Sequence, residues 1–182
     1  MNAGPTLGHK SDAFVGVEGG YKLIPGLDVF VEGGHMGNVG NTQMETAAAQ
    51  VADFIGGTVT STAIKVNYFD VGLRYHLKMV PVVHTYVLGG VGVAHTTREA
   101  TWSVNGNPVD PAPLGVQLGG DLTGSMNKTM IVVGFGINYP FMQRFFADVG
   151  YRYGGTLAKT DDVETDKALK TQRIVFGAGI RF

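Results

Sequence analysis

Ionisable side chains recur at every second position of several short segments, so that acids and bases share one side of each segment. Glu18 and Lys22 have the same parity in residues 13–23, and Asp28 and Glu32 have the same parity in residues 27–36. Strict alternation indicates an extended strand with two chemically different faces. A face of this kind could line a path for ions, or its acids and bases could neutralise one another.

The same parity assigns five acids and five bases to the charged face. They are Glu18, Lys22, Asp28, Glu32, Asp70, Arg74, Asp148, Arg152, Arg173 and Arg181. An isolated charge taken out of water costs several kcal/mol or more, so buried charges must be paired and hydrogen-bonded. The planar fork of arginine can hold two carboxylates at once. We therefore expect a self-neutralising charge network, with an ion-conducting or gated interior as the alternative.

Other chemistry is weakly represented. The chain has no Gly-x-Ser-x-Gly turn, no phosphate-binding loop and no His-Glu-x-x-His motif, and its five histidines lack the spacing of metal ligands. With no cysteine, it has neither disulfides nor thiolate metal sites. A net charge of −1 argues against a nucleic-acid partner. We expect no catalytic site, no cofactor and no metal.

The elements that carry these charges are strands whose opposite face is apolar. Phe69, Val71 and Leu73, for example, alternate with Asp70 and Arg74. Seven segments follow this pattern: 13–23, 27–36, 63–77, 85–96, 127–139, 145–154 and 174–182. A broad apolar face opposite glycine and charge is typical of a barrel turned inside out, with lipid outside and a polar lumen inside.

The connections between these segments alternate in length. Residues 24–26, 78–83 and 140–144 are short links, whereas 37–62, 97–126 and 155–170 are long. Bacterial outer-membrane barrels have short periplasmic turns and longer outer loops. We expect an all-β, antiparallel up-and-down transmembrane barrel of the eight-stranded type, in one domain over 1–182. A soluble lipocalin-like barrel is the rival, but it predicts a dry interior.

Seven strands break the even number usual in bacterial barrels, and the first of them would run from the outer side inward. We therefore expect a first strand and a signal peptide to lie upstream of this sequence. Residues 2–10 would then be the tail of a first outer loop.

The two longest connections carry features of their own. Ala48, Val51, Ala52 and Ile55 recur at helical spacing, which predicts a short helix within 45–55. This helix could cap the barrel mouth, bind a partner, or pack within its own loop. Loop 97–126 holds Trp102 and the turn signal of residues 105–108. Loops 37–62 and 97–126 are the expected places for a surface ligand.

The C-terminal pattern of Gly177, Ile180 and Phe182 resembles the signal by which outer-membrane barrels are recognised for assembly. Residues 86–92 and the repeated Asp-Val-Gly-x-Arg-Tyr at 70–75 and 148–153 resemble the outer-membrane β-barrel family of OmpA-like, OmpX-like and opacity-type porins. The resemblance implies the outer membrane of Gram-negative bacteria, with outer-membrane lipid, lipopolysaccharide and the barrel-assembly machinery as partners.

We expect a structural or surface-interaction role without catalysis. Two alternatives stay open: a narrow porin that passes ions or small solutes, and a lipid-modifying barrel enzyme.

Overall fold

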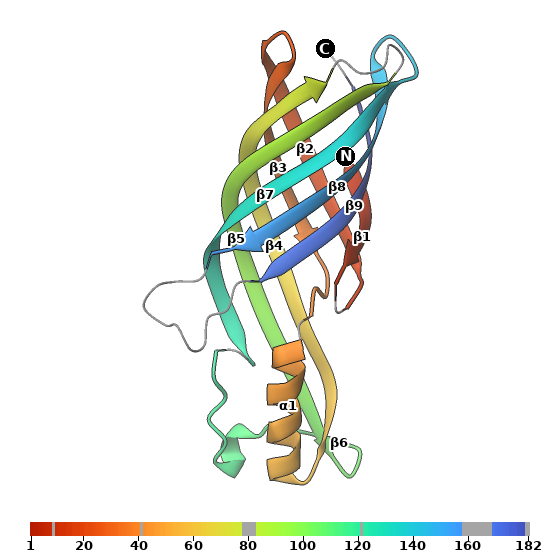
Figure 1. Cartoon of the computed structure of the whole chain (residues 1–182). Helices are drawn as coiled ribbons and strands as arrows, with labels where there is room; N and C mark the ends of the chain where they lie inside the picture. Colours follow the sequence, from red (N-terminus) through yellow and green to blue (C-terminus); the bar gives the residue numbers. More distant parts are fainter. Residues whose placement is uncertain (9, 41, 78–82, 121, 158–168, 181–182) are drawn as a thin grey trace.

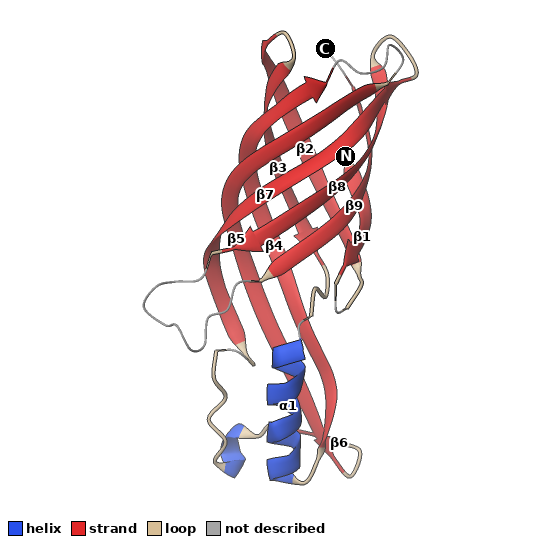
Figure 2. Cartoon of the chain, in the orientation of Figure 1, coloured by secondary structure: helices blue, strands red, loops and turns tan. Residues whose placement is uncertain are grey.

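The computed structural model describes residues 1–182 except 9, 41, 78–82, 121, 158–168 and 181–182. The described residues form nine strands, one α-helix and one short 3-10 helix (Figures 1 and 2). The strands are β1 Asn2–Leu7, β2 Ala13–Ile24, β3 Leu27–Met36, β4 Thr58–Leu77, β5 His84–Val104, β6 Asn107–Val109, β7 Gly124–Pro140, β8 Phe145–Thr156 and β9 Lys170–Ile180. Helix α1 spans Thr42–Ile55, and the 3-10 helix spans Ala112–Leu114.

The strands close into a ring. The order β4-β3-β2-β1-β9-β8-β7-β5 is completed by pairing of β5 with β4, and every pair in the ring is antiparallel. Within the described ranges the ring therefore has eight strands, while β6 pairs with β5 alone, outside the ring. The predicted fold, an antiparallel up-and-down barrel of the eight-stranded type, is confirmed.

The strand expected upstream is instead present in the sequence. Strand β1 pairs with β2 on one side and β9 on the other, with Ala3 opposite both Val15 and Phe176. The assignment of residues 2–7 to an outer loop, with only seven strands in the chain, was therefore wrong. Gly4 and Pro5 interrupt the alternation that marks the other strands, and the neighbouring ladders override this weak local signal. The signal peptide stays a prediction.

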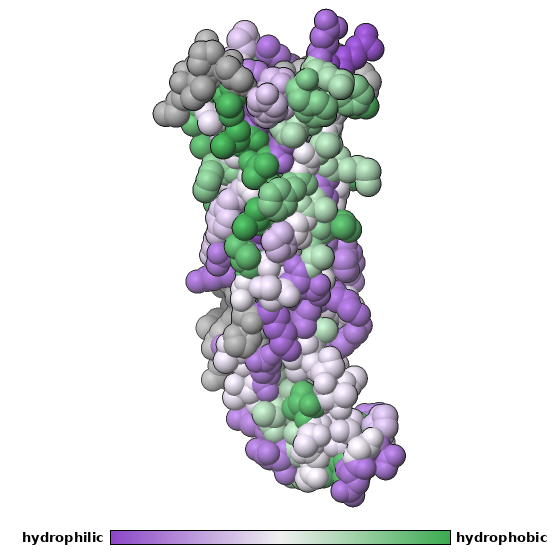
Figure 3. All heavy atoms as spheres, turned by 90° about the vertical axis from the view of Figure 1, so that its right-hand side faces the viewer, coloured by the Kyte–Doolittle hydropathy of each residue, from purple (hydrophilic) through white to green (hydrophobic). Residues whose placement is uncertain are grey.

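The barrel has inverted polarity. Val133, Phe135 and Phe176 are 50%, 61% and 53% exposed, whereas Glu32 and Arg152 are 1% and 2% exposed. The space-filling view shows apolar surface over the barrel and more hydrophilic surface toward the long-loop end (Figure 3). A soluble barrel would place the apolar residues in its centre, so the lipocalin-like alternative fails.

Strands β4 and β5 continue well past their neighbours at the long-loop end. Pairing of β3 with β4 stops at Met36 opposite Val66, but β4 and β5 remain paired as far as Thr58 opposite Ser103 (Figure 1). The predicted turn follows, with Asn105 at φ 53° and Gly106 at φ 82°, and it returns the chain into β6. Residues 58–62 and 97–104, predicted to be loop, are strand.

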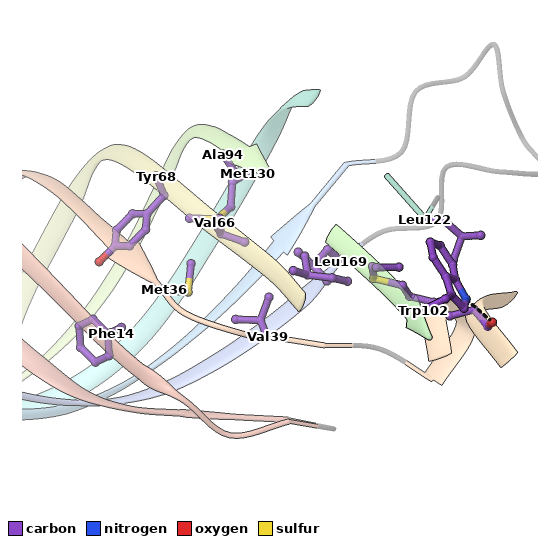
Figure 4. Close-up of a cluster of buried hydrophobic side chains, with 14 of the residues drawn as sticks. Phe14, Met36, Val39, Val66, Tyr68, Ala94, Trp102, Leu122, Met130 and Leu169 are labelled. Atoms are coloured by element: carbon purple, nitrogen blue, oxygen red, sulfur yellow. Dashed lines mark hydrogen bonds between the residues drawn. The ribbon is translucent and has the colours of Figure 1, made fainter. Parts of the chain in front are cut away.

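Helix α1 packs along this extended hairpin. Its buried residues Met44, Ala48 and Ala52 lie in the same apolar cluster as Trp102, whose indole Nε1 donates to the Ala48 carbonyl at 2.9 Å (Figure 4). The helix thus buries its apolar face within the loop's own core, one of the three roles considered for it. In the described part of the chain, no helix is both long and apolar enough to span a bilayer.

Candidate functional site

Arg152 on β8 lies at the centre of the lumen. Its Nη2 donates to Glu18 Oε2 on β2 at 2.7 Å, and its Nη1 donates to Glu32 Oε2 on β3. The side chain of Arg152 is 2% exposed and that of Glu32 is fully buried. The parity that assigned these three residues to one face therefore brings them together, and one guanidinium bridges two carboxylates.

Two further arginines flank this centre. Arg74 on β4 donates to Glu18 Oε1 at 2.6 Å, and Arg173 on β9 donates to Glu32 Oε2 at 3.2 Å. Each of the two glutamates is thus paired with two guanidiniums. Arg173 also lies 3.8 Å from Asp70, which makes a looser ion pair.

Each flanking arginine lies over a tyrosine and a phenylalanine. Arg74 is 4.4 Å from the ring centroid of Tyr86 and 5.7 Å from that of Phe30. Arg173 is 4.2 Å from Tyr68 and 5.3 Å from Phe14. Both distances to the tyrosines fall within the range of cation–π attraction. The same arrangement of arginine, tyrosine and phenylalanine is therefore built twice around the lumen.

The two tyrosines extend the network through their hydroxyls. Tyr68 donates to Glu32 Oε1 and Tyr86 donates to Asp148 Oδ2, both at 2.9 Å. Asn2 of β1 also donates to Glu32 Oε1, at 3.1 Å. Glu32 consequently accepts four hydrogen bonds, which offsets the cost of burying its charge.

Glycines make room for these tyrosines. A Cβ placed on Gly34 would lie 2.6 Å from the Tyr68 hydroxyl, and one on Gly136 would lie 2.5 Å from the Tyr86 hydroxyl. A side chain at either position would overlap the ring, so the small residues allow the aromatic side chains to cross the lumen.

The remaining predicted charges lie elsewhere. Asp28 binds His76 Nε2 at 2.7 Å near the short-turn end, and Lys22 is exposed. Arg181 lies outside the described residues. Of the assembly residues, Gly177 pairs with Asn2 and Asp148, Ile180 is 51% exposed, and Phe182 lies outside the described residues.

Sequence reasoning missed the aromatic residues of the network. Phe14 shares the parity of Glu18, Phe30 that of Glu32, and Tyr68 that of Asp70. That signal was available, but parity alone does not show which rings lie beside which guanidinium.

Some buried polar atoms in the lumen lack a hydrogen-bond partner among the described residues. Within the described ranges, both carboxylate oxygens of Asp70, Asp148 Oδ1 and Arg173 Nη1 make no hydrogen bond. The described part of the chain also contains no cluster of three or more histidine and acidic residues that could hold a metal ion. The site is thus a charged, mainly self-paired interior.

Closure of the ring, inverted polarity and a paired lumen together agree with the sequence comparison. The family described as outer membrane protein beta-barrel domain matches residues 2–182. The chain belongs to this family. Its members are bacterial outer-membrane proteins, and the outer membrane is accordingly the location of this barrel. A search of curated protein sequences finds no match.

Solved structures support the same architecture. Neisserial surface protein A (NspA) is 13% identical to this chain, with a TM-score of 0.61. The match covers 100% of this chain and 93% of the NspA chain. The N-terminal β-barrel domain of Pseudomonas aeruginosa OprF is 17% identical, with a TM-score of 0.52. The match covers 100% of this chain and 94% of the OprF chain. Identities this low show a shared fold only.

Proposed function

We propose that this barrel is a non-catalytic outer-membrane protein with a structural or surface-interaction role. The observation that carries the proposal is the double bridge from Arg152 to Glu18 and Glu32, which crosses the lumen and fills it with paired charge. In a barrel of about eight strands, side chains are enough to fill the interior. The arrangement supports a closed, self-neutralised lumen.

The interaction part of the role belongs to the long-loop end. Loops 37–62 and 97–126 combine into the α1 and β4–β5 protrusion, with its own apolar core around Trp102. Phe54 and Leu114 are 73% and 53% exposed on this protrusion. Exposed loops held by a rigid scaffold are where recognition of a surface ligand is expected. We place this end outside the cell, and propose lipopolysaccharide and the barrel-assembly machinery as the other partners.

Planar-bilayer recording of the purified protein tests the closed lumen. We expect wild-type protein to insert without a steady conductance. The matched variant Arg152→Met, which removes the central bridge, should conduct measurably more. A steady ohmic conductance from the wild type would contradict a structural role and make the protein a pore.

A narrow pore is the second candidate, and one observation favours it. The carboxylate oxygens of Asp70 accept no hydrogen bond, and they leave a polar region beside the paired centre where ions or water could be held. If wild type conducts and Asp70→Asn changes its cation selectivity, the pore is the correct function.

Labelling on intact cells tests which end is outside. The chain has no cysteine, so single substitutions report cleanly. A membrane-impermeant maleimide should label Phe54→Cys on intact cells, and should label Met142→Cys, in the short link between β7 and β8, only after permeabilisation. The opposite pattern would overturn the proposed surface role of the protrusion.

A further inference from the structure

Four polar side chains form an oblique row across the outside of four neighbouring strands. His35 on β3 pairs in register with Asn67 on β4, Asn67 with His95 on β5, and His95 with Asn127 on β7. All four side chains are exposed and share the outward parity of the apolar positions. With strands about 4.8 Å apart, the row spans roughly 14 Å.

Exposed apolar side chains such as Val133, Phe135 and Phe176 form an apolar band around the outside of the barrel. The row lies between this band and the first outward ion pair. Two residues toward the short turns, the outward positions are Phe69 on β4 and Val93 on β5, which are 54% and 57% exposed. In the other direction, Lys65 and Glu99 form an exposed ion pair at 2.9 Å. The sequence of apolar, uncharged polar and charged layers matches the passage from acyl chains through headgroups to water.

The hydrogen bonds within the row fix its outward chemistry. His35 Nδ1 lies 2.8 Å from Asn67 Oδ1, and His95 Nδ1 lies 2.7 Å from Asn127 Oδ1. A carbonyl oxygen only accepts, so each Nδ1 carries its proton and donates. In the neutral imidazole, Nε2 is then an acceptor, and among the described residues neither Nε2 atom has a hydrogen-bond partner. Each asparagine retains its Nδ2 amide as a donor.

With both imidazoles neutral, acceptors and donors alternate along the row: His35 Nε2, Asn67 Nδ2, His95 Nε2 and Asn127 Nδ2. A hydroxyl group both donates and accepts, so a chain of sugar hydroxyls complements this pattern. Phosphate oxygens accept, and they would meet the lone pair of each Nε2. Lys65, two positions along β4 from Asn67, is paired with Glu99.

We propose that the row His35–Asn67–His95–Asn127 binds the sugar headgroup of a glycolipid in the membrane leaflet at the long-loop end. The proposal rests on the proposed function, because it requires the barrel to be inserted with its apolar band in the acyl chains. It adds the four residues that recognise the sugar part of such a lipid.

The test places the protein in nanodiscs of three compositions: phosphatidylcholine alone, phosphatidylcholine with a neutral galactolipid, and phosphatidylcholine with phosphatidic acid. Side-chain amide NMR resonances of Asn67 and Asn127 are recorded in each. We expect both resonances to shift with the galactolipid and to stay in place with phosphatidic acid. Equal spectra in all three, or a shift with phosphatidic acid alone, would overturn the proposal.

A double variant tests the contribution of the ring nitrogens of His35 and His95. In His35→Ala with His95→Ala, the galactolipid-induced shift should be lost, whereas His84→Ala, at the other end of β5, should retain it. Migration of unboiled protein on gels is measured in parallel. Protein that inserts and folds but shows no galactolipid effect refutes this inference alone. Protein that never inserts refutes the proposed function as well.

Discussion

Arg152 and Glu32 lie 120 positions apart in the chain and form an ion pair that is almost completely buried. Their strands, β8 and β3, are separated in the ring by β9, β1 and β2. The pair therefore crosses the lumen instead of following a strand ladder. It connects opposite walls of the barrel, and Glu18 repeats the connection through the second guanidinium nitrogen.

Replacing the central arginine should cost much of the barrel's stability. Arg152→Met leaves Glu18 with Arg74, and Glu32 with Arg173, as the one remaining guanidinium partner in the network described above. Removing one partner from a buried ion pair typically costs about 3–5 kcal/mol, because a charge is left uncompensated. Urea unfolding in lipid vesicles measures the loss, and an effect below about 1 kcal/mol would contradict the assigned role.

The pair should also be strongly coupled. Glu32→Gln removes the carboxylate that Arg152→Met would otherwise leave underpaired. The double variant should therefore lose less stability than the sum of the two single variants. Additive losses would mean that Arg152 and Glu32 stabilise the barrel independently.

Crowding of the tyrosine should make Gly34→Ala destabilising. The added Cβ would lie 2.6 Å from both the Tyr68 hydroxyl and the Val15 carbonyl oxygen. Overpacking of this kind costs about 1–3 kcal/mol. Gly155→Ala is the matched control on β8, because its Cβ would have no neighbour within 4 Å. Equal unfolding free energies for the two variants would show that the lumen tolerates the overlap.

Removing the hydrogen bond from the Trp102 indole to the Ala48 carbonyl should loosen the protrusion without unfolding the barrel. Trp102→Phe keeps an aromatic ring but loses the donor to the Ala48 carbonyl, a bond worth about 1 kcal/mol. We expect faster proteolysis within α1 and an unchanged gel migration of the unboiled barrel. Cleavage at the wild-type rate would show that α1 is held by packing alone.

Asp12 should make the start of the long connection 37–62 sensitive to acid, because its carboxylate binds Asn38 there. The backbone N–H groups of Asn38 and then Ala13 bind its carboxylate, and they lower the pKa of Asp12 below its usual value. Because the pKa is lower in the folded state, the ionised carboxylate stabilises the fold fully above the unfolded pKa of about 4. This stabilisation is lost as the pH falls through the lower folded-state pKa. The Asn38 amide resonance should therefore move only in strong acid. In Asp12→Asn that transition should be absent, and its persistence would assign it to another group.

The sequence predicts the strands and their facing well, because each long strand carries many alternating positions. Glu18, Glu32 and Arg152 could be placed on one face by parity alone. Strand β1 was missed because its six residues contain Gly4 and Pro5, and its pairing depends on β2 and β9, which are distant in the chain. The rings over Arg74 and Arg173 depend on register around the ring, which no local pattern contains.

The central claim is that the outward apolar band meets lipid acyl chains. A fluorophore on Val133→Cys, in the band on β7, reports this directly, because the chain has no other cysteine. In vesicles of lipids brominated on their acyl chains, we predict strong quenching at position 133 and none on Phe54→Cys in the protrusion. Equal, weak quenching at both positions would contradict the account.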